Sequence, residues 1–127
     1  YWTRKISDPK WRGRSGSQLA LEVKSDEPNE LVIMLTENFF RSYRGRQQEY
    51  LALVPLKGGD DWQSVKLSPS DFLTPDKQQP LESWEHLDLL GLRAFYQQRG
   101  SDKIFGSNRW KGPQPTFRKM RWEAVND

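Results

Sequence analysis

The sequence DDWQSVKLSPSDFLTPDKQQPLESWEHLDLLGLRAFYQ, residues 60–97, carries the densest signals for the fold of this chain. It holds two tryptophans, a Ser-Pro-Ser-Asp-Phe turn and a long apolar run. Within it, residues 62–67 alternate between two sets. One set is Trp62, Ser64 and Lys66, and the other is Gln63, Val65 and Leu67, and this alternation predicts a half-buried strand. We therefore expect this stretch to supply a central part of the hydrophobic core.

Residues 81–98 fit both a helix and a strand. Ser83 is suited to a helix N-cap, and several apolar residues have helical spacing. Gly91 and the two aromatic residues after it favour a strand. We expect a short helical turn near residues 82–86, followed by a strand.

The rest of the chain is dominated by strand patterns separated by turns. Residues 30–38 are apolar in both alternating sets, which is typical of a central strand covered on both faces. Pro55 lacks an amide proton and places its strand at an edge or a bulge. Residues 1–17 have no sustained period and predict an irregular arm. The remaining expected strands are 18–24, 30–38, 49–56 and 116–125.

Length and composition set further bounds. A chain of 127 residues is large enough for one domain, residues 1–127, and too small for two ordinary ones. It begins with Tyr1 and not with Met, so we expect a module of a longer protein. There is no cysteine and only His86, which excludes disulfides, thiolate metal sites and sites with several histidines within these residues.

The formal charge of +3 is unevenly distributed. Residues 1–16, 41–46 and 109–121 are rich in Arg and Lys and nearly free of acids, whereas residues 49–88 hold eight acids and three lysines. If the basic segments meet in space, they attract an anionic partner in a salt-dependent way. The alternative is that they form separate solvated faces.

A set of short patterns gives the chain a family resemblance. They are Trp62-Gln-x-Val-x-Leu, Ser70-Asp71-Phe72, Trp84-x-x-Leu87-Asp88-x-Leu90 and Arg121-Trp122-Glu123. In this order they resemble the galactose-binding-domain-like jelly rolls, and among these the non-catalytic carbohydrate-binding modules of polysaccharide-degrading enzymes. The resemblance covers most of the chain from residue 18 onward.

The resemblance implies a fold and a role. The fold is all-β, an antiparallel jelly-roll β-sandwich of about seven to nine strands. The role is non-catalytic binding of an acidic (sulfated or uronic) or mixed polysaccharide, and the module is attached to a larger secreted or cell-surface protein. Such sandwiches bind sugars by stacking an aromatic ring on the C–H face of a pyranose, while Arg and Lys bind its hydroxyl and acidic groups.

Two loops offer exposed aromatic rings for this purpose. Trp110 lies in a Gly- and Pro-bearing loop between Arg109 and Lys111, and it is the first candidate. Its alternative role is to fold back and plug the end of the sandwich. Tyr43, near Arg41, is the second candidate, and its alternative is an ordinary edge-strand aromatic residue.

The strands offer further candidates. Trp62 and Trp11 are possible platforms, although for Trp62 the resemblance suggests instead a structural role at the start of a strand. Trp84 and Trp122 have apolar neighbours and are expected in the core. In residues 116–125, simple alternation places Trp122 opposite a set formed by Phe117, Lys119, Arg121 and Glu123. If the strands of Arg93, Lys119 and Arg121 are neighbours, these three form a cationic floor for sulfate or uronate groups. The alternative is a solvated charged face.

Other functions and ligands have weaker support in the sequence. The acid pairs Asp60–Asp61 and Glu82–Glu85 fall in polar turns, so we do not expect a hydrolase or lyase. A structural calcium site could use Asp26, Glu27 and Glu30, although their spacing matches no calcium motif. A protein-assembly module is the main alternative, and a contiguous exposed apolar patch would favour it. A net charge of +3 is modest for nucleic-acid binding.

Overall fold

The chain is nearly all antiparallel β-structure, as its alternating pattern predicts. The computed structural model describes residues 2–3, 13–37, 48–75, 79–85, 87–97, 104–106 and 110–124. One sheet has the order β5-β2-β9 (the β2 sheet), another the order β1-β6-β3-β4 (the β3 sheet), and β7 pairs with β8. The strands are β1 (Trp2–Thr3), β2 (Ser17–Lys24), β3 (Asn29–Glu37), β4 (Gln48–Leu56), β5 (Gln63–Leu67), β6 (Leu87–Arg93), β7 (Phe95–Gln97), β8 (Ile104–Gly106) and β9 (Thr116–Ala124).

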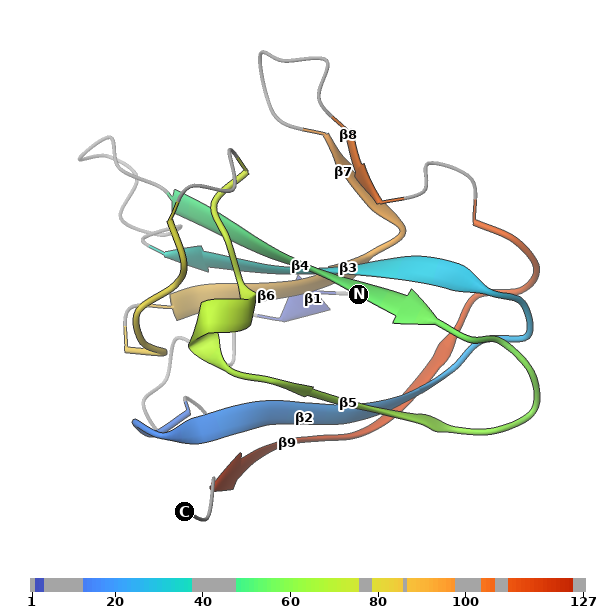
Figure 1. Cartoon of the computed structure of the whole chain (residues 1–127), viewed down its shortest axis with the longest axis horizontal. Coiled ribbons are helices and arrows are strands. Elements are labelled where there is room, and N and C mark those ends of the chain that lie inside the picture. Colours follow the sequence, from blue (N-terminus) through green and yellow to red (C-terminus); the bar gives the residue numbers. More distant parts are fainter. Residues whose placement is uncertain are drawn as a thin grey trace.

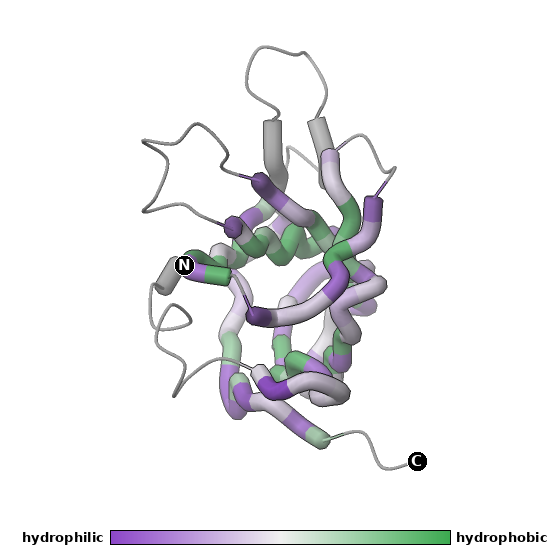
Figure 2. Tube along the Cα trace, turned by 90° about the vertical axis from the view of Figure 1, so that its left-hand side faces the viewer, coloured by the Kyte–Doolittle hydropathy of each residue, from purple (hydrophilic) through white to green (hydrophobic). Residues whose placement is uncertain are grey.

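The two sheets lie face to face, with the β3 sheet above the β2 sheet in Figure 1. The chain passes from one sheet to the other between β2 and β3, between β4 and β5, and again between β5 and β6. Along the lower layer, hydrophobic and hydrophilic residues alternate (Figure 2). Each sheet therefore turns one apolar face toward the other, which is the arrangement of a sandwich.

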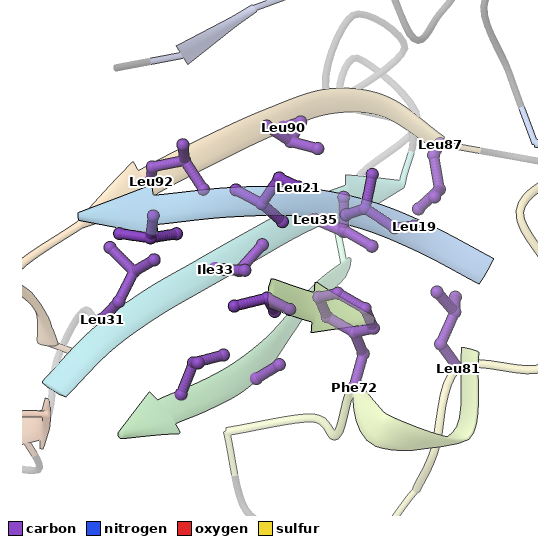
Figure 3. Close-up of a cluster of buried hydrophobic side chains, with 14 of the residues drawn as sticks. Leu19, Leu21, Leu31, Ile33, Leu35, Phe72, Leu81, Leu87, Leu90 and Leu92 are labelled. Atoms are coloured by element: carbon purple, nitrogen blue, oxygen red, sulfur yellow. The ribbon is translucent and has the colours of Figure 1, made fainter. Parts of the chain in front are cut away.

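The core fills the space between the sheets (Figure 3). Leu19 and Leu21 of β2 point toward Ile33 and Leu35 of β3, and Phe72 closes one end of the layer. All five side chains are at most 2% exposed. At about 25 cal/mol per Å² of apolar surface removed from water, this layer is the main source of stability.

Trp84 is the largest side chain in the core and is 1% exposed. Its ring meets that of Phe72 edge-on, with centroids 5.8 Å apart, and lies 4.9 Å from that of Trp122. Its indole N–H donates to the carbonyl oxygen of Ser17 at 3.0 Å, so the polar atom keeps a partner when buried. The predicted core positions of Trp84 and Trp122 are confirmed, with Trp122 packed at the margin.

β3 is covered on both faces, as its doubly apolar pattern predicts. The side turned away from the β2 sheet carries Val32, Met34, Leu51 and Leu89, which are buried together at 0–6% exposure. β3 is also central in its sheet, between β6 and β4. β4 is at the edge, where Pro55 can be accommodated without a broken ladder.

The helical turn predicted near residues 82–86 is not formed as a helix over 82–85, the part of that range that the structure describes. A single turn takes its place, in which the N–H of Leu87 donates to the oxygen of Trp84 at 3.5 Å. A longer helix does not fit here, because Trp84 is inserted into the core and β6 begins at Leu87. A short 3-10 helix, η4 (Pro69–Asp71), lies instead in the Ser-Pro-Ser-Asp-Phe turn, where the N–H of Ser68 donates to Asp71 Oδ2 at 2.7 Å.

The start of the predicted irregular arm takes part in a sheet. Trp2 and Thr3 form β1 and pair with Gly91 and Leu90 of β6. Residues 4–12 lie outside the described part of the chain. No helix among the described residues is long and apolar enough to cross a membrane.

Candidate functional site: the basic face of the β2 sheet

The outward face of the β2 sheet is strongly charged. Strand residues alternate between the two faces of a sheet, and Leu19, Leu21 and Val23 of β2 point into the core. Their neighbours Glu22 and Lys24 therefore point outward. Among the residues that the structure describes, the cationic side chains on this side outnumber the carboxylates by five to two. We define the basic face as Lys24, Lys66, Arg118, Lys119 and Arg121 together with Glu22, Glu123 and Trp62.

A bulge in β9 creates much of this face. The register shifts between Ala20 and Glu22, which pair with Arg121 and Arg118, so β9 holds one residue more than β2. The bulge contains Lys119, whose φ of 54° is in the left-handed region. Because of the extra residue, Phe117 and Trp122 both pack against the core although they have opposite parity in the sequence.

Because of the bulge, the simple alternation expected for residues 116–125 does not hold along the whole of β9. Simple parity puts Phe117 with Lys119 and Arg121, opposite Trp122. In the structure Phe117 joins Trp122 on the core side, and Arg118 joins Arg121 on the outward side. Sequence parity therefore missed Arg118 as a member of the site.

Two carboxylates each bind two cations on the basic face. Glu22 Oε1 lies 3.0 Å from Arg118 Nε and 3.6 Å from Lys119 Nζ. Glu123 Oε1 lies 2.6 Å from an Arg121 terminal nitrogen, and Glu123 Oε2 lies 3.1 Å from Lys66 Nζ. The two carboxylates are thus partners that an incoming anion must replace.

These cations also set the acidity of the two carboxyl groups. The hydrogen bond from Arg118 is the largest influence that lowers the pKa of Glu22, and the charge of Lys119 adds to it. Hydrogen bonds from Lys66 and Arg121 lower the pKa of Glu123. Both groups therefore stay ionised at pH values at which an ordinary Glu begins to take up a proton.

Trp62 stands at one end of the basic face. The guanidinium carbon of Arg118 lies 3.9 Å from the ring centroid, and Lys24 Nζ lies 5.9 Å from it. These are cation–π contacts that hold the ring beside the charged groups. The predicted outward direction of Trp62 is confirmed, but Arg118 occupies one side of the ring, so a sugar must use the other side or displace Arg118.

The tryptophan predicted as the first binding platform lies elsewhere. Trp110 is half-buried and packs against the main core. Its indole N–H donates to the oxygen of Pro113 at 2.9 Å. Lys111 is tied down through its backbone, which exchanges two hydrogen bonds of 2.9 Å with the Asn29 amide. This placement matches the alternative role of Trp110, a ring that folds back over the end of the sandwich.

The expected cationic floor of Arg93, Lys119 and Arg121 does not form. Arg93 belongs to β6 in the β3 sheet, where it pairs with Val32, whereas β9 belongs to the β2 sheet. Lys119 and Arg121 instead share their face with Lys66 and Arg118. The polar set of residues 62–67 points to Lys66, but the order of strands in a sheet cannot be read from it.

The other predicted residues give little further detail. Trp11, Arg41, Tyr43, Arg109 and His86 lie outside the described residues. Asp60, Asp61, Glu82 and Glu85 are described and exposed. Within the described ranges, no group of three or more acidic or histidine side chains is placed to hold a metal, so Asp26, Glu27 and Glu30 form no such group.

Exposed apolar side chains are scattered. The large ones in the described part of the chain are Leu53 on β4 and Met120 on β9, at 36% and 37% exposure. These strands belong to different sheets, so the two residues do not form one patch. The basic face is therefore the more distinctive surface of the described residues. Comparisons with models of protein families, with curated proteins and with solved structures find no match.

Proposed function

We propose that this chain is a non-catalytic carbohydrate-binding module that holds an acidic polysaccharide on the basic face. The observation that carries the proposal is the gathering of five cationic side chains and Trp62 on one side of the β2 sheet. This gathering supports the salt-dependent attraction of an anionic partner that the uneven charge of the sequence leads us to expect.

The shape of the face suits a chain-like ligand. Glu22 and Glu123 each lie at the centre of one cation cluster. Glu123 of β9 pairs with Gln18 of β2, so the two carboxylates are separated by four residues along β2. At about 3.3 Å per residue, the clusters are about 13 Å apart along the strand direction. A ligand that reaches both is longer than a single sugar ring and carries at least two acidic groups.

Sulfate and uronate groups fit this chemistry. Arg118 and Arg121 present planar forks that match oxyanions, and Lys66 and Lys119 add mobile point charges. The cations of the existing ion pairs are exposed, and ion pairs at such positions are individually weak, so a polyanion can compete with the carboxylates for them. The ring of Trp62 adds an apolar surface at one end of the same face.

The finer features of the fold remain part of this proposal. The face-to-face sheets and the repeated passage of the chain between them support a jelly-roll sandwich of the galactose-binding-domain-like kind. As in the modules that the sequence resembles, the chain would act within a larger secreted or cell-surface protein and raise that protein's local concentration on its polysaccharide. The scattered positions of Leu53 and Met120 do not favour the alternative of a protein-assembly module.

Affinity electrophoresis tests the proposal. The chain is run through gels that contain dextran sulfate, polygalacturonate or neutral dextran, at low and at high salt. We expect retardation by at least one of the two polyanions, which high salt reverses, and none by neutral dextran. Equal migration in all gels, or retardation by dextran alone, would contradict the proposal.

A further inference from the structure

A pocket of about 370 Å³ opens beside the basic face, at the end of the β2 sheet where the turn between β4 and β5 approaches the turn between β2 and β3. Trp62 is part of its wall and also carries Arg118 on its ring, so the pocket and the basic face share this residue. The volume is near the lower end of the range for small-molecule sites, which suits a single ring better than a polymer segment.

The walls of the pocket are preformed. Gln63 Oε1 accepts from the N–H of Lys57 at 3.0 Å, and its amide nitrogen donates to the oxygen of Pro55 at 2.9 Å. The N–H of Gly59 donates to the oxygen of Asp26 at 3.0 Å and joins the two turns. Gly58 has a φ of 79°, and a Cβ there would lie 2.5 Å from the Glu27 backbone, so the turns touch where only glycine fits. Binding need not order this region first.

The lining combines apolar and polar groups without a net charge. Val23 and Leu56 also line the pocket but are at most 4% exposed, so the apolar surface that a ligand can reach comes mainly from Trp62. Lys57 and Asp61 supply one cation and one carboxylate, and both are exposed, as is Ser64. A carboxylate accepts from sugar hydroxyls and an ammonium donates to them, while apolar surface covers C–H groups. An acidic ring would meet Asp61, so the lining favours an uncharged one.

We propose that this pocket is a chain-end subsite. It holds one uncharged hydroxylated sugar ring at the end of a glycan whose acidic units lie on the basic face, and to that extent the inference rests on the function proposed above. Trp62 is the junction between the two parts. Binding then starts at a chain end, and the polysaccharide is not held only by interior segments.

The test is an NMR titration of the ¹⁵N-labelled full chain with the methyl glycosides of glucose, galactose, mannose, xylose and N-acetylglucosamine. We expect at least one of them to shift the amide signals of residues 57–64, with little effect on those of 118–121. Asp61→Asn should lower the affinity for that glycoside about tenfold, because one hydrogen bond to a charged group is lost. Asp60→Asn is the matched control, because Asp60 lies in the same turn outside the pocket lining, and it should bind as the wild type does.

Two outcomes overturn the subsite: no glycoside moves the 57–64 signals, or Asp61→Asn binds as tightly as the wild type. Retention on dextran sulfate, measured on the same samples, separates this failure from failure of the proposed function. Retention without glycoside binding removes the subsite and leaves the basic face. Glycoside binding without retention on any polyanion keeps the neutral-sugar pocket and overturns its link to an acidic chain.

Discussion

The outward sides of the two sheets differ sharply although both sheets are antiparallel and share one core. On the β3 sheet, the outward side carries the buried residues Val32, Met34, Leu51 and Leu89, beside the exposed Leu53 and Arg93. On the β2 sheet, the outward side carries the basic face, and the four cations that form ion pairs there are 40–63% exposed. The β3 sheet therefore uses much of its outward side for stability, whereas the outward side of the β2 sheet is open to solvent.

The largest expected effect comes from placing a charge on the buried outward side. Val32→Asp puts a carboxylate at a position that is 0% exposed, so we expect a loss of about 3–5 kcal/mol in the free energy of unfolding, or no folding at all. Ser64→Asp, at an exposed position on the other sheet, should change it by less than about 0.5 kcal/mol. Urea unfolding followed by tryptophan fluorescence measures both, and similar midpoints for the two variants would remove the contrast.

Removing cations tests the binding role of the basic face. Lys66→Gln combined with Arg121→Gln should weaken retention on the polyanion about tenfold, because two contacts worth about 1 kcal/mol or less each are lost. Arg93→Gln is the control, since Arg93 is an exposed cation on the β3 sheet. Affinity electrophoresis at low salt gives the comparison. If Arg93→Gln weakens binding as much as the double variant, net charge explains the result and the face does not.

Removing the two carboxylates should act in the opposite direction. In Glu22→Gln combined with Glu123→Gln, the cations lose their internal partners, so we expect about threefold tighter retention on the same polyanion. Asp60→Asn combined with Glu82→Gln removes the same charge at exposed positions outside the basic face and the pocket, and should tighten binding less. Equal effects of the two double variants would show that the carboxylates do not compete with the ligand.

The same pair of carboxylates predicts a pH dependence of stability. Their pKa values are lower in the folded chain than in the unfolded chain, so their contribution is present above the usual range of Glu. It is lost as the pH falls through the lower, folded values. The wild type should therefore lose more stability than the double Gln variant between the usual Glu range and strong acid. Urea midpoints measured across this window test it, and parallel curves would contradict it.

The smallest expected effect concerns the bulge. Lys119→Gly relieves the left-handed backbone at φ 54° but loses an exposed ion pair and adds freedom to the unfolded chain, so we expect a gain of about 0.5 kcal/mol. Lys66→Gly, in regular strand geometry, should instead lose about 0.5–1 kcal/mol. Opposite shifts of the urea midpoint would confirm that the bulge stores strain. Equal losses would contradict it.

The longer strands were predictable because each is encoded locally, whereas the short strands β1 and β8 were not expected. Residues 18–24 and 62–67 alternate cleanly, and the double apolar pattern of residues 30–38 indicated a strand with both faces covered. The helical turn expected near residues 82–86 is reduced to the single turn between Trp84 and Leu87, because local helix propensity competes with the insertion of Trp84 into the core, which is a tertiary effect. The sequence does not report that competition.

The site was only partly predictable. Trp62, Lys119 and Arg121 belong to the basic face, as outward or charged residues should. Arg93 does not, because strand order depends on contacts between distant segments. Arg118 was missed because a bulge reverses the alternation in the middle of β9, and nothing in local composition marks where an extra residue is inserted.

The bulge at Lys119 has a consequence for encounters between copies of the chain. Within the described strands, β9 is an edge of its sheet, and an edge strand presents unpaired N–H and C=O groups to any other strand. A left-handed residue in the middle of β9 interrupts this row, and the adjacent cations repel an identical edge. The geometry that turns Arg118 outward therefore also disfavours edge-to-edge pairing between copies of the chain.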